Sequence, residues 1–168
     1  MKDERAWYGR IPVYVAAILI VLADQATKYL IQATVPLYES IPVIEGFFSI
    51  THVRNPGAAF GILAGFSPAW RFIFLVCVTL VVMGVIIVFL ERNRQAGRTF
   101  TSGLVLILGG AGGNLIDRVS YGEVIDFLDF YVGSWHWPAF NVADAAITLG
   151  AFLLVIDMVR NREAGETP

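Results

Sequence analysis

Residues 70–90 read WRFIFLVCVTLVVMGVIIVFL, a run in which Arg71, next to the start, is the only charged residue. About 20 apolar residues in a helix cross a bilayer core, so this run predicts a transmembrane helix. Three further windows, approximately 11–31, 100–119 and 137–159, are long and apolar enough to do the same, although they carry polar residues. The chain is therefore expected to form a single integral membrane domain over 1–168, with an all-α core of four transmembrane helices.

The composition of the chain agrees with a membrane protein. Of its 168 residues, 57% are hydrophobic and 15% are charged. A soluble domain has about 25% charged residues, and at this size it could not bury so much apolar surface. The composition excludes a soluble enzyme, a disordered tail and a disulfide-rich secreted module, and the net charge of −2 argues against a nucleic-acid partner. Cys77 is the only cysteine, which excludes an intrachain disulfide.

The basic residues predict how the four helices are oriented. Eight of the 12 Lys and Arg residues lie before the first span, between the second and third, or after the fourth. By the positive-inside rule both termini are cytoplasmic, and the loops at approximately 32–69 and 120–136 face outward. A cleavable signal peptide ending at Val21-Leu22-Ala23 is an alternative for the N-terminus. The three spans that follow, and the apolar residues at 29–31, favour a retained helix.

The two outer loops have different compositions. The first contains residues 47–53, which are rich in β-forming side chains, and then the turn signal Asn55-Pro56-Gly57. We expect a small β-structure there, lying on the outer membrane surface. The second loop concentrates aromatic residues, which favour the headgroup region, so interfacial anchoring is one interpretation of Trp135 and Trp137.

Polar residues in three of the four spans fall at one depth. Counting about 1.5 Å per residue, Asp24, Asn114 and Asp144 are all expected roughly 20 Å from the cytoplasmic face. Ionisable groups in the hydrocarbon region are costly unless they face protein or water and find partners. Lys28 follows Asp24 by four residues, a spacing that favours an ion pair. A shared polar site in the outer third of the membrane is predicted, and two further sets share helix faces: Asn114 with Asp117 and Arg118, and Asn141 with Asp144.

Two alternatives to a catalytic site remain open from the residues alone. The polar groups could be structural contacts between helices, with Lys28 and Arg118 snorkelling to the outer interface. That interpretation leaves Asp144 unexplained, because no basic residue lies within a helical turn of it. A proton-coupled transporter could use Asp24, Asp117 and Asp144 as a relay. A relay should cross the whole membrane, whereas these residues stop in its outer third.

Other motifs are weaker signals. The run Gly109–Gly113 lacks the lysine and the strand–helix context of a phosphate loop, and it lies within a span, so it predicts close helix packing. His52 and His136 lie in different loops and are too few for a zinc site. We therefore expect no metal centre. Neither GxSxG nor HExxH occurs, so serine and zinc hydrolysis have no support.

At the polar residues the sequence resembles a known family, the lipoprotein (type II) signal peptidases of bacteria. The resemblance covers nearly the whole chain, and its blocks are highly specific when taken together. Pro56 fills a position that we take to be variable in the family. The blocks are Asp24-Gln25-Ala26-Thr27-Lys28, Asn55-Pro56-Gly57-Ala58-Ala59-Phe60, the segment 109–118 that ends Asn114-Leu115-Ile116-Asp117-Arg118, Val124-Ile125-Asp126-Phe127, and Phe140-Asn141-Val142-Ala143-Asp144.

The resemblance implies an intramembrane aspartic protease that cleaves prolipoproteins before a diacylglyceryl-modified cysteine. It implies Asp126 and Asp144 as the catalytic pair, four transmembrane helices with an outer β-cradle, and no cofactor. The implied location is the bacterial inner membrane, with the site toward the periplasm. The implied partners are membrane lipid, the lipid-modified substrates and globomycin-type inhibitors. The residues implied to bind substrate or support the pair are Asn55, Gly57, Asn114, Arg118, Asn141, Asp24, Lys28 and Asp117.

The chemistry of two carboxyls agrees with that assignment. Two close carboxyl groups cannot both ionise easily, so they tend to share one proton. The ionised member can take a proton from water, and the protonated member can polarise the scissile carbonyl.

Overall fold

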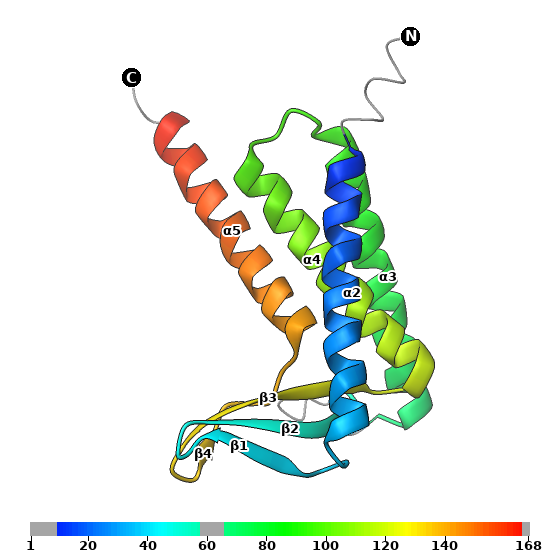
Figure 1. Cartoon of the computed structure of the whole chain (residues 1–168). Coiled ribbons are helices and arrows are strands. Elements are labelled where there is room, and N and C mark those ends of the chain that lie inside the picture. The colour runs from blue at the N-terminus through cyan, green and yellow to red at the C-terminus, as the bar shows by residue number, and fades with distance from the viewer. Residues whose placement is uncertain (1–9, 58–65, 166–168) are drawn as a thin grey trace.

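The computed structural model describes residues 10–57 and 66–165, with side chains described as far as Asn161. Its long helices are α2 (Ile11–Thr34), α3 (Pro68–Arg92), α4 (Arg98–Tyr121) and α5 (Val142–Gly165). All four are long and apolar enough to cross a membrane, as predicted. The start of α2 and the end of α5 lie at the end of the bundle away from the sheet (Figure 1). Lys2, Arg5 and the block residues Ala58, Ala59 and Phe60 lie outside the described residues.

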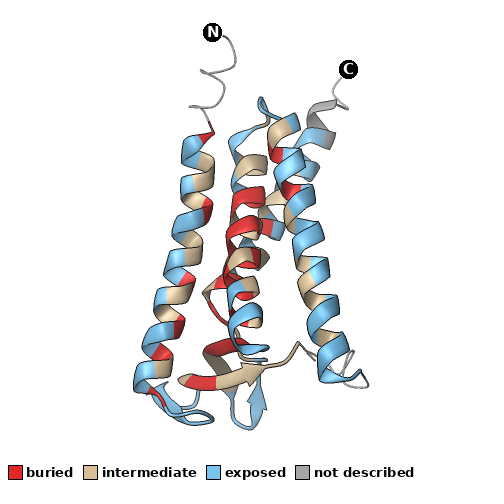
Figure 2. Ribbon diagram, turned by 90° about the vertical axis from the view of Figure 1, so that its right-hand side faces the viewer, coloured by how far each residue is buried: buried red, intermediate tan, exposed pale blue. Residues whose placement is uncertain are grey.

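Helix α4 is the centre of the bundle and packs against α2, α3 and α5. Figure 2 shows buried positions gathered on this helix. Its glycines permit the close approach, because a Cβ atom at Gly109 would lie 2.7 Å from the Ile20 Cβ and 2.9 Å from the Ala17 carbonyl oxygen. A Cβ at Gly110 would meet the Ala143 carbonyl oxygen. The packing interpretation of the glycine run is confirmed.

The sheet lies across one end of the helices (Figure 1). Its strands are β1 (Ser40–Ile44), β2 (Phe48–Asn55), β3 (Val124–Val132) and β4 (Trp135–His136), antiparallel and in the order β1-β2-β3-β4. The first outer loop supplies β1 and β2, as predicted. The second loop supplies β3 and β4, which the sequence prediction did not include. Residues 124–127 of β3 are all buried, so the alternation that marks a half-exposed strand is absent there.

The fourth helix begins at Val142, whereas the sequence predicted a span from Trp137. The segment before it runs along β3 instead. Phe140 exchanges backbone hydrogen bonds with Leu128, at 2.8 and 3.1 Å, and the Trp137 N–H donates to the Phe130 carbonyl. Asp144 therefore lies in the first turn of α5, and the predicted start of the fourth span at Trp137 is wrong. The prediction that Asp144 lies level with Asn114 and Asp24 is confirmed, because Asn114 donates to Asp144 and the Ala143 N–H donates to Asp24.

Candidate active site

Asn141 joins the two aspartates of the predicted pair. Asp126 lies on β3 and is buried, and Asp144 lies in the first turn of α5. The Asn141 side-chain Nδ2 donates to Asp126 Oδ1 at 2.7 Å, and its backbone N–H donates to Asp144 Oδ2 at 3.3 Å. The Asp144 N–H donates back to Asn141 Oδ1 at 2.8 Å. A residue between strand and helix therefore fixes the two carboxyls relative to each other.

Asn55 holds the other oxygen of Asp126. Its Nδ2 donates to Asp126 Oδ2 at 2.9 Å, because the pairing of β2 with β3 brings the end of β2 beside this aspartate. Its Oδ1 accepts from the Gly57 N–H at 2.9 Å, which fixes the orientation of the amide. Gly57 has φ of +82°, and a Cβ there would also collide with Leu75. A residue with a side chain at 57 would thus be strained by its backbone and by its neighbour.

The environment of Asp126 changes its acidity. Burial raises the pKa of Asp126 to about 7, and the nearby charge of Asp144 raises it too, while the hydrogen bonds from Asn55 and Asn141 lower it. Burial disfavours the charged carboxylate because the protein solvates it less well than water does. At neutral pH, Asp126 therefore holds a proton for a substantial part of the time, as one member of a proton-sharing pair must.

Asn114 links Asp144 to a buried lysine. Lys28 Nζ donates to Asn114 Oδ1 at 3.0 Å, and Asn114 Nδ2 donates to Asp144 Oδ1 at 2.8 Å. An ammonium group has only donors, so it selects the oxygen of the amide and turns the NH₂ group toward the carboxylate. Lys28 thus sets the hydrogen-bonding direction of a residue that touches Asp144.

Lys28 is the centre of a buried ion cluster. Its Nζ lies 2.8 Å from Asp24 Oδ2 and 2.7 Å from Asp117 Oδ2, and all three side chains are at most 1% exposed. The predicted Asp24–Lys28 pair is present, whereas the snorkelling alternative for Lys28 is wrong. The pairing with Asp117 is an addition that helical spacing does not reveal.

Each carboxylate of the ion cluster also accepts a hydrogen bond from a backbone N–H next to one of the two predicted catalytic aspartates. Asp24 Oδ1 accepts from the Ala143 N–H at 2.9 Å, one residue before Asp144. Asp117 Oδ2 accepts from the Ile125 N–H at 3.1 Å, one residue before Asp126. The cluster therefore fixes the backbone immediately before Asp126 and before Asp144.

Gln25 belongs to this network, although the sequence analysis did not select it. Its Nε2 donates to Asp117 Oδ1 at 2.8 Å and to the Gly113 carbonyl oxygen at 3.1 Å. The sequence feature that could have pointed to Gln25 is its position inside the Asp24–Lys28 block.

Arg118 is half-buried, and its guanidinium donates to the Asn114 carbonyl oxygen at 3.4 Å. Among the described residues no carboxylate lies within ion-pair distance of Arg118.

A cavity of about 530 Å³ opens beside Asp144. Apolar side chains dominate its wall, and they come from the approach to α5 and from the helix itself: Trp137, Phe140, Ala145, Leu149 and Phe152. In residues 10–57 and 66–165, no three His, Cys, Asp or Glu side chains are grouped to hold a metal ion. The site thus presents a carboxyl at the edge of an apolar space.

Comparison with known proteins identifies the family. Residues 16–160 match the model described as signal peptidase (SPase) II. The chain belongs to the signal peptidase II family. A lipoprotein signal peptidase of Syntrophus aciditrophicus is 50% identical over 149 residues, which cover 89% of this chain and 92% of the relative. One of Geobacter sulfurreducens is 56% identical over 137 residues, covering 82% and 84%.

A solved structure extends the family likeness to the fold. A bacterial membrane enzyme determined by the in meso method at 2.3 Å resolution has a TM-score of 0.82 and 33% identity to this signal peptidase II family member. The match covers 94% of this chain and 93% of that one. The fold is therefore shared along nearly the whole length of both chains.

Proposed function

We propose that this member of the family is an aspartic endopeptidase that removes signal peptides from prolipoproteins, with Asp126 and Asp144 as its catalytic residues. The observation that carries the proposal is the attachment of both carboxyls to Asn141, together with a pKa of about 7 for Asp126. This arrangement places a carboxyl that is partly protonated at neutral pH close to a second carboxyl, and general acid–base hydrolysis of a peptide bond uses such a pair.

The two aspartates take different roles. Asp126 is the more buried, and it acts as the protonated member that donates to the scissile carbonyl oxygen. Asp144 accepts from Asn114 and from the Asn141 N–H, which orient its carboxyl, and it lines the cavity, where it takes a proton from the attacking water. Their titration belongs to the pair, so the protons redistribute as the reaction proceeds.

The substrate we propose is a prolipoprotein whose cysteine carries diacylglycerol. The apolar cavity beside Asp144 suits acyl chains that lie in the same leaflet as the site. Asn55, Gly57, Asn114, Asn141 and Arg118 surround the substrate, and Asp24, Lys28 and Asp117 support the pair. Globomycin-type cyclic peptides would inhibit by filling the same space, and catalysis would need no cofactor.

We also propose that the chain is one domain of the bacterial inner membrane, with both termini in the cytoplasm and the sheet end toward the periplasm. The concentration of basic residues before α2, between α3 and α4, and after α5 supports this orientation. Reporter fusions after Arg94 and after Gly133 should read inside and outside respectively. The same side for both fusions would overturn the topology.

The catalytic assignment is tested by replacing one aspartate at a time. Asp126→Asn and Asp144→Asn should each abolish cleavage of a diacylglyceryl-modified prolipoprotein by the purified protein in detergent, with helix content unchanged. The double variant should be scarcely worse than either single one, because residues that act as a unit are not additive.

Asp129 is the matched control for this experiment. It lies on β3 with Asp126, but its carboxyl contacts His136 at 2.9 Å instead of the site. Asp129→Asn should keep most of the activity. Substantial cleavage by Asp144→Asn, or equal losses in Asp129→Asn and Asp126→Asn, would overturn the assignment.

A further inference from the structure

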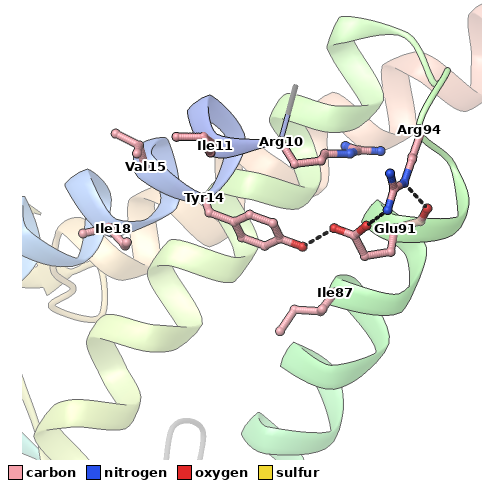
Figure 3. Close-up of a pocket in the computed structure, with 8 residues that line it drawn as sticks. All are labelled: Arg10, Ile11, Tyr14, Val15, Ile18, Ile87, Glu91 and Arg94. Atoms are coloured by element: carbon pink, nitrogen blue, oxygen red, sulfur yellow. Dashed lines mark hydrogen bonds and ion pairs between the residues drawn. The ribbon is translucent and has the colours of Figure 1, made fainter. Parts of the chain in front are cut away.

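A second cavity lies at the end of the bundle far from the sheet. It has a volume of about 520 Å³ and lies between the start of α2 and the end of α3. Ile11, Val15 and Ile18 of α2 and Ile87 of α3 form its aliphatic wall (Figure 3). All four side chains are exposed on the outside of the bundle, so in a membrane the cavity opens toward lipid.

Charged groups gather at one end of this cavity (Figure 3). Glu91 is already occupied, because it accepts from the Tyr14 hydroxyl at 2.6 Å and pairs with Arg94 at 2.7 Å. Arg10 is only 8% exposed and donates one hydrogen bond, to the Leu90 carbonyl oxygen in the last turn of α3. Among the described residues no carboxylate lies within 4.0 Å of its guanidinium. Two arginines and one glutamate leave an excess of one positive charge.

A buried guanidinium has five N–H donors and a charge that needs a counter-ion. Arg10 lines the cavity, and its guanidinium donates a single hydrogen bond within the part of the chain that the structure describes, so the cavity offers an approach to its other donors. The cavity is thus suited to an amphipathic anion, with its charged group at Arg10 and its apolar chain along the aliphatic wall.

We propose that this cavity binds an anionic phospholipid, with its phosphate at Arg10 and Arg94 and an acyl chain along Val15, Ile18 and Ile87. Basic pockets between transmembrane helices commonly bind phospholipid headgroups in this way. The lipid completes the contact between α2 and α3, which both pack against α4 and are joined here through Tyr14–Glu91 and Arg10–Leu90. The start of a signal peptide is a poor occupant, because its basic residues would meet an excess of positive charge.

The test measures lipid binding by the purified full chain in detergent, using native mass spectrometry. Phosphatidylglycerol and phosphatidylcholine with identical acyl chains are compared at equal concentrations. The native protein should retain phosphatidylglycerol about tenfold better, because the choline cation of phosphatidylcholine offsets its phosphate charge and would meet the excess of positive charge at the cavity. Equal retention of the two lipids would overturn the proposal.

Three variants separate this site from general attraction of anionic lipid to a basic surface. Arg10→Gln should reduce phosphatidylglycerol retention about tenfold. Val15→Trp should block both lipids by filling the aliphatic slot, and it keeps the test decisive if Arg10→Gln does not fold. Arg98→Gln removes an exposed charge from the same end of the molecule, outside the cavity, and should change nothing.

Two results would contradict the proposal. An equal loss in Arg98→Gln and Arg10→Gln would show diffuse attraction without a site. Displacement of phosphatidylglycerol by an equimolar peptide with a basic signal-peptide start would assign the cavity to substrate. Prolipoprotein cleavage is not the readout, so failure of the lipid proposal is distinguishable from failure of the catalytic one.

Discussion

Helices α2 and α4 meet along two stretches that are built in opposite ways. Farther from the sheet, the contact is apolar, with Gly109 facing Ala17 and Ile20. One helical turn nearer the sheet, Gly113 leaves room for Asp24, and a Cβ there would collide with its carboxylate. In both stretches a glycine on α4 leaves space for α2, and that space is filled by close backbone packing in one stretch and by a buried carboxylate in the other.

The two stretches depend on their residues differently. The apolar contact needs only small and complementary shapes, so each residue contributes through local packing. The polar contact needs every charge and hydrogen-bonding group to be satisfied together, because a buried charge that loses its partner is costly. Substitutions in the polar stretch should therefore be strongly coupled, and those in the apolar stretch should act through the space they occupy.

The largest effect is expected for Lys28→Met. It leaves the Asp24 and Asp117 carboxylates buried without a counter-charge, which should cost about 3–5 kcal/mol of stability. The triple variant Asp24→Asn, Lys28→Met and Asp117→Asn should recover part of that loss, since it removes the uncompensated charges. Thermal unfolding in detergent measures both. A triple variant less stable than Lys28→Met would contradict the view that the cluster is coupled.

A smaller loss is expected for Gly109→Ala in the apolar stretch. Its Cβ would lie 2.7 Å from the Ile20 Cβ and force the helices apart, which should cost about 1–3 kcal/mol. Gly84→Ala on α3 is the matched control, because nothing lies within 4 Å of its added Cβ. That control should be neutral or slightly stabilising through helix propensity. Equal unfolding temperatures for the two variants would refute the close-packing account.

The pH dependence of cleavage tests Asp126, whose neighbour Ile125 is held by Asp117 of the polar stretch. With a pKa of about 7, Asp126 loses its proton as the pH rises, so activity should fall about tenfold per pH unit above that value. Asn55→Ala removes a hydrogen bond that lowers this pKa, and its alkaline limb should move to higher pH. Asn93→Ala, at the end of α3, should leave the profile unchanged. A limb that stays in place in Asn55→Ala would argue against Asp126 as the acid.

The smallest effect is expected for Gln25→Leu. It removes the donor to Asp117 and to the Gly113 carbonyl oxygen, which should cost about 1–2 kcal/mol of stability and lower activity only modestly. Gln32→Leu on the same helix is the control, since Gln32 makes a half-buried bond with Arg54. Its loss should be below about 0.5 kcal/mol. If the two variants lose stability equally, Gln25 has no special place in the network.

Much of the site could be predicted from residue types and their spacing. The Asp24–Lys28 pair follows from a four-residue interval on one helix, and Asn114 and Asp144 follow from the cost of polar groups in a span. The assignment of Asp126 depended on the family resemblance. Nothing in the periodicity of residues 124–127 marks them as a strand, because burial on both faces removes the alternation.

The sequence by itself determined the number of spanning helices and the β-forming character of the first outer loop. Both depend on local properties, namely the length of an apolar run and the side chains of a short segment. Only the tertiary structure decided that β3 joins that sheet, that α5 starts at Val142, and that Lys28 pairs with Asp117 as well as Asp24. These features depend on contacts between residues far apart in the chain, such as Phe140 with Leu128 and Asn141 with Asp126, which no local pattern encodes.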